Sequence, residues 1–258
     1  MQPFVEYDSI VRKIWGKGDT VLFVFAGAAA EFALNKAVDW LYFTGRLPSD
    51  PLGRLFSTVT YAKHIVFAPK EEAVKAIQNL RKIHESVEES RGASIPDWAY
   101  RDVLFMLIYY SIASYELLEK PLSYKEKEEV YDVFYMVGIG MSLKELPKTY
   151  KEWLIARQQH LDEDLTNSDY TLDLFKQYKK HLGNFRYSIL IEGQKLLVPD
   201  RVKEYLDFKP NSLLKPIVPM YKLSRTISFD KIIKSLILPS KYKKQIKDLD
   251  VPTNYLNI

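Results

Sequence analysis

The chain contains no cysteine. This absence excludes disulfide bonds, iron–sulfur clusters, haem ligation by a thiolate and any zinc site built on sulfur. It is typical of a protein from a reducing compartment. Long apolar runs are also missing, because the run at residues 21–30 ends at Glu31. A membrane-spanning helix needs about 20 apolar residues. We therefore expect a buried core helix here, no secretory signal and a cytoplasmic protein.

Charge of one sign is scarce as well, since 37 basic and 33 acidic residues leave a net charge of only +4. Lysines gather in residues 231–247, directly behind and within an apolar stretch at residues 232–238. A solvated basic helix face is one interpretation. The other is peripheral contact with an anionic membrane through residues 231–247. Because no nucleic-acid-binding module accompanies these lysines, we expect no nucleic acid partner.

The chain is rich in helical periodicity, and alternation typical of strands is nearly absent. Its 258 residues, 47% of them hydrophobic, are enough for one large domain with a substantial core. The sequence predicts a single all-α domain over residues 1–258, with about ten helices. The expected helices are 20–43, 51–68, 70–91, 96–118, 124–137, 150–160, 168–182 and 185–197, followed by shorter helices after residue 199.

Local signals support several of these boundaries. Ser123 with Glu126, and Thr149 with Glu152, have the spacing of a capping box at a helix start. The glycine-containing segment 138–141 is expected to interrupt the chain between two helices. It is not a phosphate-binding loop, because no strand precedes it and no lysine follows it.

Three residues form the most informative constellation. Arg54 and Thr58 lie four residues apart, so they share a face of the predicted helix 51–68. His84 lies on the apolar stripe of the next helix, seven residues after Ile77. An arginine and a hydroxyl facing a buried imidazole form the two sides of a haem pocket in one interpretation. In the other, His84 is a core histidine bonded to a backbone carbonyl, and Arg54 pairs with Asp50.

The remaining histidines predict less. His64 is expected to be a core or pocket residue, and His160 and His181 are expected at the surface near helix ends. No two histidines are spaced i, i+4, which disfavours zinc and di-iron sites. The chain also lacks the G-x-S-x-G motif of serine hydrolases.

The sequence resembles the oxygenase MpaB family, which includes the latex-clearing protein (rubber oxygenase). The similarity runs from about residue 20 to 245, and the order and spacing of several short motifs carry it. The chain differs from other members in three places. Ser57 stands where rubber oxygenase has a lysine beside its threonine, residues 35–40 lack the His-Pro of many bacterial members, and residues 104–109 lack the second histidine that many members carry in the long central helix. The matching pieces are Gly27, Asp50-Pro-Leu-Gly-Arg54-Leu with Thr58, Ile83-His84-Glu-Ser-Val87, Tyr115-Glu116, Pro121-Leu-Ser123 with Glu126, Val137-Gly138 with Met141, Leu146-Pro147 and Leu238-Pro239.

The resemblance implies a distantly globin-like helical fold around one haem b. It implies that His84 is the proximal ligand of the iron, and that Arg54 and Thr58 lie on the distal side. The implied activity is that of a haem-dependent oxygenase. Its substrate would be an unsaturated apolar, isoprenoid- or lipid-like molecule that is oxidised with dioxygen, with cleavage of a C=C bond as one outcome.

Two further hypotheses remain open from the sequence. The first is a non-catalytic helical protein that binds haem or a hydrophobic ligand. The second is a helical interaction scaffold without a cofactor. The three hypotheses differ in whether the protein binds haem, and in whether loss of the His84 imidazole removes it.

Overall fold

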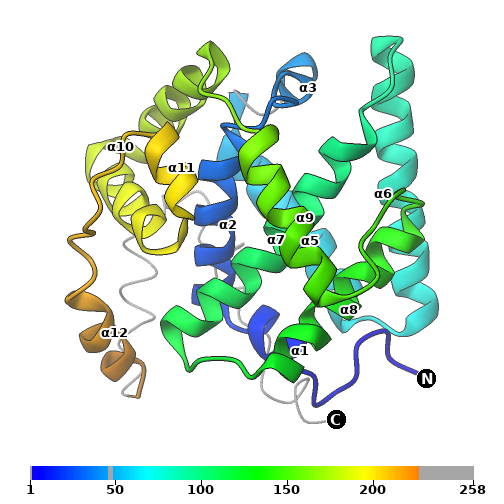
Figure 1. The fold of residues 1–258 in the computed structure, drawn as a ribbon, viewed down its shortest axis with the longest axis horizontal. Coiled ribbons are helices and arrows are strands. Elements are labelled where there is room, and N and C mark those ends of the chain that lie inside the picture. Colours follow the sequence, from blue (N-terminus) through cyan, green and yellow to red (C-terminus); the bar gives the residue numbers. More distant parts are fainter. Residues whose placement is uncertain (1, 46–48, 227–258) are drawn as a thin grey trace.

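Helices account for the regular structure of the described chain (Figure 1). The structure is a computed structural model that describes residues 2–45 and 49–226. Within these residues β-structure is limited to two isolated bridges, so the predicted all-α class is confirmed. The helices are α1 (Ile10–Trp15), α2 (Gly18–Phe32), α3 (Asp39–Phe43), α5 (Pro51–Phe67), α6 (Lys70–Arg91), α7 (Asp97–Leu118), α8 (Tyr124–Gly140), α9 (Tyr150–Glu163), α10 (Asp169–Leu197), α11 (Asp200–Tyr205) and α12 (Ile217–Thr226).

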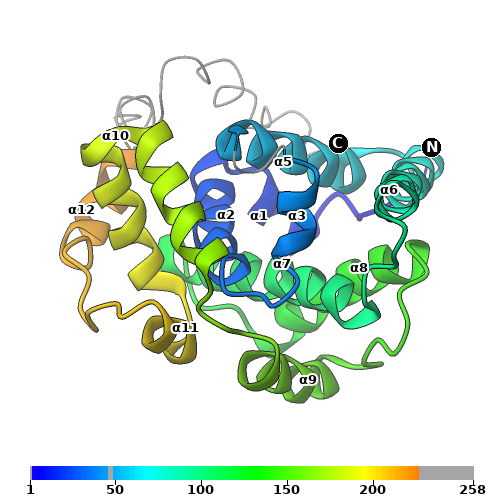
Figure 2. The same cartoon turned by 90° about the horizontal axis from the view of Figure 1, so that it is seen from above.

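Helices α2 and α7 pack against each other at the centre, and the other helices surround this pair (Figures 1 and 2). Gly27 of α2 lies directly against the ring of Tyr110 of α7, which is fully buried. A Cβ atom at residue 27 would come within 2.3 Å of that ring, so only glycine permits this approach of the two helices. The sequence of α7 is apolar on nearly all sides of the helix, which fits a helix enclosed by its neighbours.

Helices α5 and α6 contact each other and are joined at Ala68 and Pro69. The side chain of Asp50 caps α5 by accepting a hydrogen bond from the backbone N–H of Gly53 at 3.2 Å. Residues 2–4 cross the junction as a strap. The backbone N–H of Phe4 donates to the Ala68 carbonyl at 3.3 Å, and that of Lys70 donates to the Gln2 carbonyl at 2.9 Å. The strap fixes the turn between the two helices.

One predicted helix is wrong in extent. The expected helix 20–43 ends at Phe32, and a separate short helix, α3, begins at Asp39. Asn35 accounts for the break, because its side chain accepts a hydrogen bond from the backbone N–H of Ala37 at 2.8 Å. Local bonds of this type compete with helical hydrogen bonds.

The glycine segment 138–141 also differs from expectation. Helix α8 continues through Gly138 to Gly140 and ends only at Met141. A Cβ atom on Gly138 would lie 2.8 Å from side-chain atoms of Leu104 and Leu146, so this glycine serves close helix packing. Gly183, by contrast, has a φ of 75° and bends α10 where the sequence predicted a division into two helices.

The described part of the chain contains no helix that is long and apolar enough to cross a lipid bilayer. The segment 231–247, for which the sequence suggested membrane contact, lies outside the described residues. The same is true of Leu238 and Pro239.

Candidate functional site

A largely apolar cavity of about 640 Å³ lies between α2, α5, α6, α7, α10 and α12. This volume falls within the range of about 300–1,000 Å³ that is typical of cofactor and small-molecule sites. Polar side chains are few in its wall, and Arg54, Thr58 and His84 are among them. The structure therefore brings all three residues singled out in the sequence to one cavity. Apolar side chains near them include Ala62, Ile65, Leu80, Ile83, Val87 and Val103.

His84 enters the cavity from α6, and its imidazole is half-buried. Its ring packs edge-on against Tyr100 of α7, with 5.2 Å between the ring centroids. The Nδ1 atom of His84 is buried, and no described residue forms a hydrogen bond with it. Burial of a ring nitrogen without a partner costs free energy, so this atom marks a place where a group bound in the cavity can be held.

The electrostatic surroundings of His84 favour a neutral imidazole. Burial lowers the pKa of His84, the positive charge of Arg54 lowers it further, and the carboxylate of Glu88 opposes both effects. Glu88 itself accepts hydrogen bonds from the backbone N–H of Ile95 at 2.7 Å and from the Tyr100 hydroxyl at 3.2 Å. A neutral imidazole has a free lone pair, which is the form that binds iron.

Arg54 and Thr58 face the cavity from one side of α5, as their spacing predicted. The hydroxyl of Thr58 donates a hydrogen bond to the backbone carbonyl of Arg54 at 3.1 Å. Its oxygen can still accept a hydrogen bond from a group in the cavity. His64 of the same helix is exposed, so the prediction that it is a core or pocket residue is wrong. A different face of α5 carries it to solvent.

A second cluster of polar side chains lies in the core, and it was not predicted from the sequence. His160 was expected at the surface, but only 2% of its side chain is exposed. Its Nε2 atom lies 2.9 Å from a carboxylate oxygen of Glu31 on α2. Arg157, one helical turn earlier on α9, contacts both oxygens of the same carboxylate. The Tyr110 hydroxyl donates a further hydrogen bond to Glu31 at 2.8 Å.

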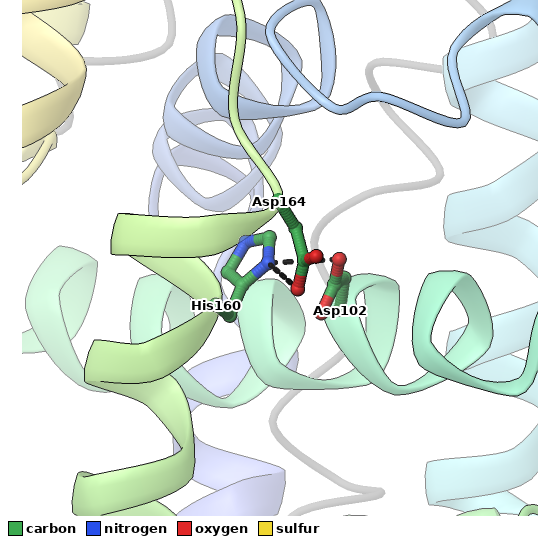
Figure 3. A group of neighbouring side chains, drawn as sticks. All are labelled: Asp102, His160 and Asp164. Carbon is green, nitrogen blue, oxygen red and sulfur yellow. Dashed lines mark ion pairs between the residues drawn. The ribbon is translucent and has the colours of Figure 1, made fainter.

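Aspartates complete this group on the other side of His160 (Figure 3). The Nδ1 atom of His160 lies 2.8 Å from Oδ2 of Asp102 and 3.6 Å from Oδ2 of Asp164. Asp102 also accepts a hydrogen bond at 2.9 Å from Asn35, whose side chain lines the cavity. We call Glu31, Asp102, Arg157 and His160 the buried ionic network.

Charges in the buried ionic network stabilise one another. Burial alone would raise the pKa of Glu31, but Arg157 and His160 outweigh it and lower the pKa to about 2. Burial alone would lower the pKa of His160, but its contacts with Asp102 and Glu31 outweigh that and raise the pKa to about 9. His160 is therefore a cation at neutral pH.

Asp102, His160 and Asp164 also have the composition of a metal site, with their ligand atoms within 4.8 Å of one another. Ligand atoms that share one ion at about 2.0–2.2 Å lie about 3 Å or more apart. The 2.8 Å between His160 and Asp102 is shorter and fits a direct ion pair. A signal for the network was present in the sequence. Glu31 and Asp102 interrupt apolar helices, and Arg157 and His160 share a face of α9 with Trp153.

The chain belongs to the family described as ER-bound oxygenase mpaB/B'/Rubber oxygenase, catalytic domain, whose model matches residues 12–229. The family suspected from the sequence motifs is thereby confirmed. The family description is that of an oxygenase catalytic domain, which places this chain among the oxidoreductases. No curated protein and no solved structure gives a significant match to the chain.

Proposed function

We propose that this protein binds haem b through His84 and oxidises an unsaturated apolar substrate with dioxygen. The observation that carries the proposal is the buried, unpartnered Nδ1 atom of His84 in the wall of a large apolar cavity. A ring nitrogen of this kind would suit a ligand of haem iron. The oxygenase family adds independent support for chemistry with dioxygen.

Haem, when bound, supplies the iron centre at which dioxygen chemistry takes place. The residues of the chain have three tasks. His84 would hold the iron, and its packing against Tyr100 keeps the ring in one orientation. Arg54 would attract an anionic group, such as a haem propionate, or polarise dioxygen in the cavity. Thr58 would orient dioxygen in one of two ways: its hydroxyl would give up the bond to the Arg54 carbonyl and donate into the cavity, or its oxygen would accept from a protonated group there. The apolar wall would exclude water and admit a polyprenyl- or lipid-like chain.

Several finer points belong to the same proposal. They are a single catalytic domain over residues 1–258, a distant likeness to the globin fold, and C=C cleavage as the outcome of oxidation. A cytoplasmic location is supported by the lack of cysteine. A non-catalytic protein that binds a hydrophobic ligand is the alternative, and the apolar cavity alone is compatible with it.

The first test is an absorption spectrum of the full chain, expressed with a haem precursor. We expect a Soret band in the wild type and its loss in His84→Ala. The matched control is His64→Ala, because His64 lies on the neighbouring helix and is exposed. Circular dichroism would show that all three proteins keep their helices.

Three results would contradict the proposal in different ways. Absence of a Soret band from the wild type removes the oxygenase mechanism and leaves the ligand-binding alternative. An unchanged band in His84→Ala removes His84 as the ligand. A haem-loaded wild type that consumes no dioxygen with any of a series of isoprenoids of increasing length removes the catalytic part.

A further inference from the structure

Helix α12 presents apolar side chains to solvent. Leu213, just before the helix, is 75% exposed, Ile217 is 49% exposed, Met220 is 72% exposed and Leu223 is 71% exposed. Ile217, Met220 and Leu223 are spaced three residues apart and so lie on one side of the helix, and Leu213 is in the turn that precedes it. We call these four residues the outer face of α12. Contiguous exposed apolar side chains of this kind mark interaction surfaces.

Polar contacts on the side of α12 opposite to the outer face attach the helix to Asp19 and Glu119. The Tyr221 hydroxyl donates a hydrogen bond to Asp19 at 3.1 Å, and the Lys222 ammonium donates one to the Glu119 carbonyl at 2.9 Å. Arg225 forms an ion pair with Glu119. The helix is thus fixed to α2 and to the end of α7 through its polar residues. This attachment leaves the apolar residues of the outer face pointing away from the protein.

The inner side of α12 forms part of the cavity wall. Leu214, Val218 and Tyr221 line the cavity. Ile217 lines it as well, although half of its surface is exposed. Ile217 therefore lies at a rim where the cavity reaches the surface. In both views α12 lies at the edge of the molecule farthest from α6, the helix that carries His84 (Figures 1 and 2).

The segment that carries the outer face is basic, although acidic groups lie near it. Asp207 just before the segment is exposed, and Glu192, which is paired with Lys195, accepts a hydrogen bond from the backbone N–H of Leu213 at 2.6 Å. Residues 208–226 contain four basic residues and no acidic residue. Lys222 and Arg225 are engaged in the contacts with Glu119, whereas Lys209 and Lys215 are exposed. A second copy of the same face would bring lysines against lysines, which opposes self-association. Anionic lipid headgroups are complementary to this arrangement, because lysine attracts them while apolar side chains enter the acyl boundary.

We infer that the outer face of α12 docks on an anionic lipid bilayer and brings the rim at Ile217 to the lipid phase. The apolar cavity then opens toward the interior of the bilayer, where an apolar substrate is most concentrated. Entry of a substrate by this route rests on the proposed function. The docking itself does not, so its test requires neither haem nor turnover.

The test is flotation of the full chain with vesicles of phosphatidylcholine, with and without phosphatidylserine. We expect binding to the vesicles that contain phosphatidylserine, and at least about a tenfold weaker partition for the double variant Met220→Asp/Leu223→Asp. The matched control is Met136→Asp/Ile155→Asp. These two residues are also exposed, at 53% and 61%, and lie on α8 and α9, away from α12. The control should bind as the wild type does.

Lysine substitutions test the electrostatic part. Lys209→Gln/Lys215→Gln should weaken binding several-fold with phosphatidylserine present and leave binding to pure phosphatidylcholine unchanged. Because all substituted residues are exposed, thermal unfolding should be unaffected and will show that each variant is folded.

Other occupants of the outer face give different results. Lack of wild-type flotation on either vesicle overturns the inference. So does equal binding by Met220→Asp/Leu223→Asp, because another part of the chain would then carry the contact. A wild-type dimer in light scattering that becomes a monomer only in this variant would assign the face to a second copy, and would also overturn it.

Discussion

Arg157 and Glu31 meet in the core as a two-point ion pair, with each oxygen of the carboxylate in contact with one terminal nitrogen of the guanidinium. Their side chains are 5% and 0% exposed. A charge buried to this degree depends on its partner, because removal of one member leaves the other without solvent or counter-charge. The pair joins α2 to α9, which are 126 residues apart in sequence at this contact.

Substitution of Arg157 by leucine should therefore destabilise the fold strongly. We expect a loss of about 3–5 kcal/mol in the free energy of unfolding, measured in urea. Arg201→Leu is the matched control, because Arg201 forms an exposed ion pair with Glu204 on α11. It should leave the urea midpoint unchanged. An equally small effect of Arg157→Leu would mean that the Glu31 carboxylate does not depend on Arg157 as its buried counter-charge.

Stability should also depend on pH through His160. Its pKa is raised to about 9 in the folded protein, against about 6.5 in an unfolded chain. The contribution is therefore fully present below about pH 6.5 and is lost as pH rises through about 9, with a total of about 3 kcal/mol. Urea unfolding between pH 6 and 10, as an approximate range, would show this loss.

Two variants test this pH dependence, His160→Gln as the test and His64→Gln as the matched control. His160→Gln should flatten the fall in stability across that range, whereas His64→Gln should keep it, because His64 is exposed. The same slope in wild type and His160→Gln would contradict the assignment of His160 as a buried cation.

The contact between Gly27 and Tyr110 predicts a steric effect. A methyl group at residue 27 would lie 2.3 Å from the Tyr110 ring. That ring cannot move away easily, because it is fully buried and hydrogen-bonded to Glu31. Gly27→Ala should lower the melting temperature, with a cost of about 1–3 kcal/mol.

Gly193→Ala provides the comparison. Residue 193 is also helical, but its nearest neighbour would be Phe23 at 3.5 Å, an ordinary contact. Because alanine has a higher helix propensity than glycine, Gly193→Ala should stabilise the protein by up to about 1 kcal/mol. Equal melting temperatures for Gly27→Ala and Gly193→Ala would contradict the close packing of α2 and α7.

Thr58 offers a test of the proposed site that separates cofactor binding from turnover. Thr58→Val preserves shape and removes the hydroxyl, so haem content should remain and dioxygen consumption with an isoprenoid should fall about tenfold or more. Thr60→Val is the matched control. Thr60 makes the same type of bond to the carbonyl four residues earlier, at 2.9 Å, but it is exposed. Equal activity of both variants would remove Thr58 from the mechanism.

Helix periodicity made most of the fold predictable. Ser123 at a helix start and Gly92, the residue directly after the predicted helix 70–91, are local signals, and both cap helices in the structure. The break after Phe32 was missed because it depends on a bond from the side chain of Asn35, which a periodic pattern does not contain. Gly138 was taken for a breaker because its partners, Leu104 and Leu146, come from other parts of the chain.

The candidate site was predictable only in part, for a related reason. Arg54 and Thr58 share a face by spacing alone, so their position in one wall followed from the sequence. The burial of His160 did not, because it requires carboxylates from α2 and α7 to arrive beside α9. A histidine near charged residues is typical of a helix end at the surface. Tertiary contacts overrode that pattern here.

The strap formed by residues 2–4 has a consequence for the cavity. The chain passes directly from the helix with Arg54 and Thr58 to the helix with His84, and the turn at Ala68 and Pro69 is the hinge between them. Two backbone hydrogen bonds, between Phe4 and Ala68 and between Gln2 and Lys70, connect the strap to this turn. The opening angle between two walls of the cavity is thus set by main-chain bonds close to Ile65, a cavity residue that shares one apolar cluster with Ala68 and Phe4. Substitutions at the exposed Gln2 should be tolerated as long as its carbonyl still reaches Lys70, whereas Phe4 also packs its side chain against the core. Removal of the strap would let the two walls separate.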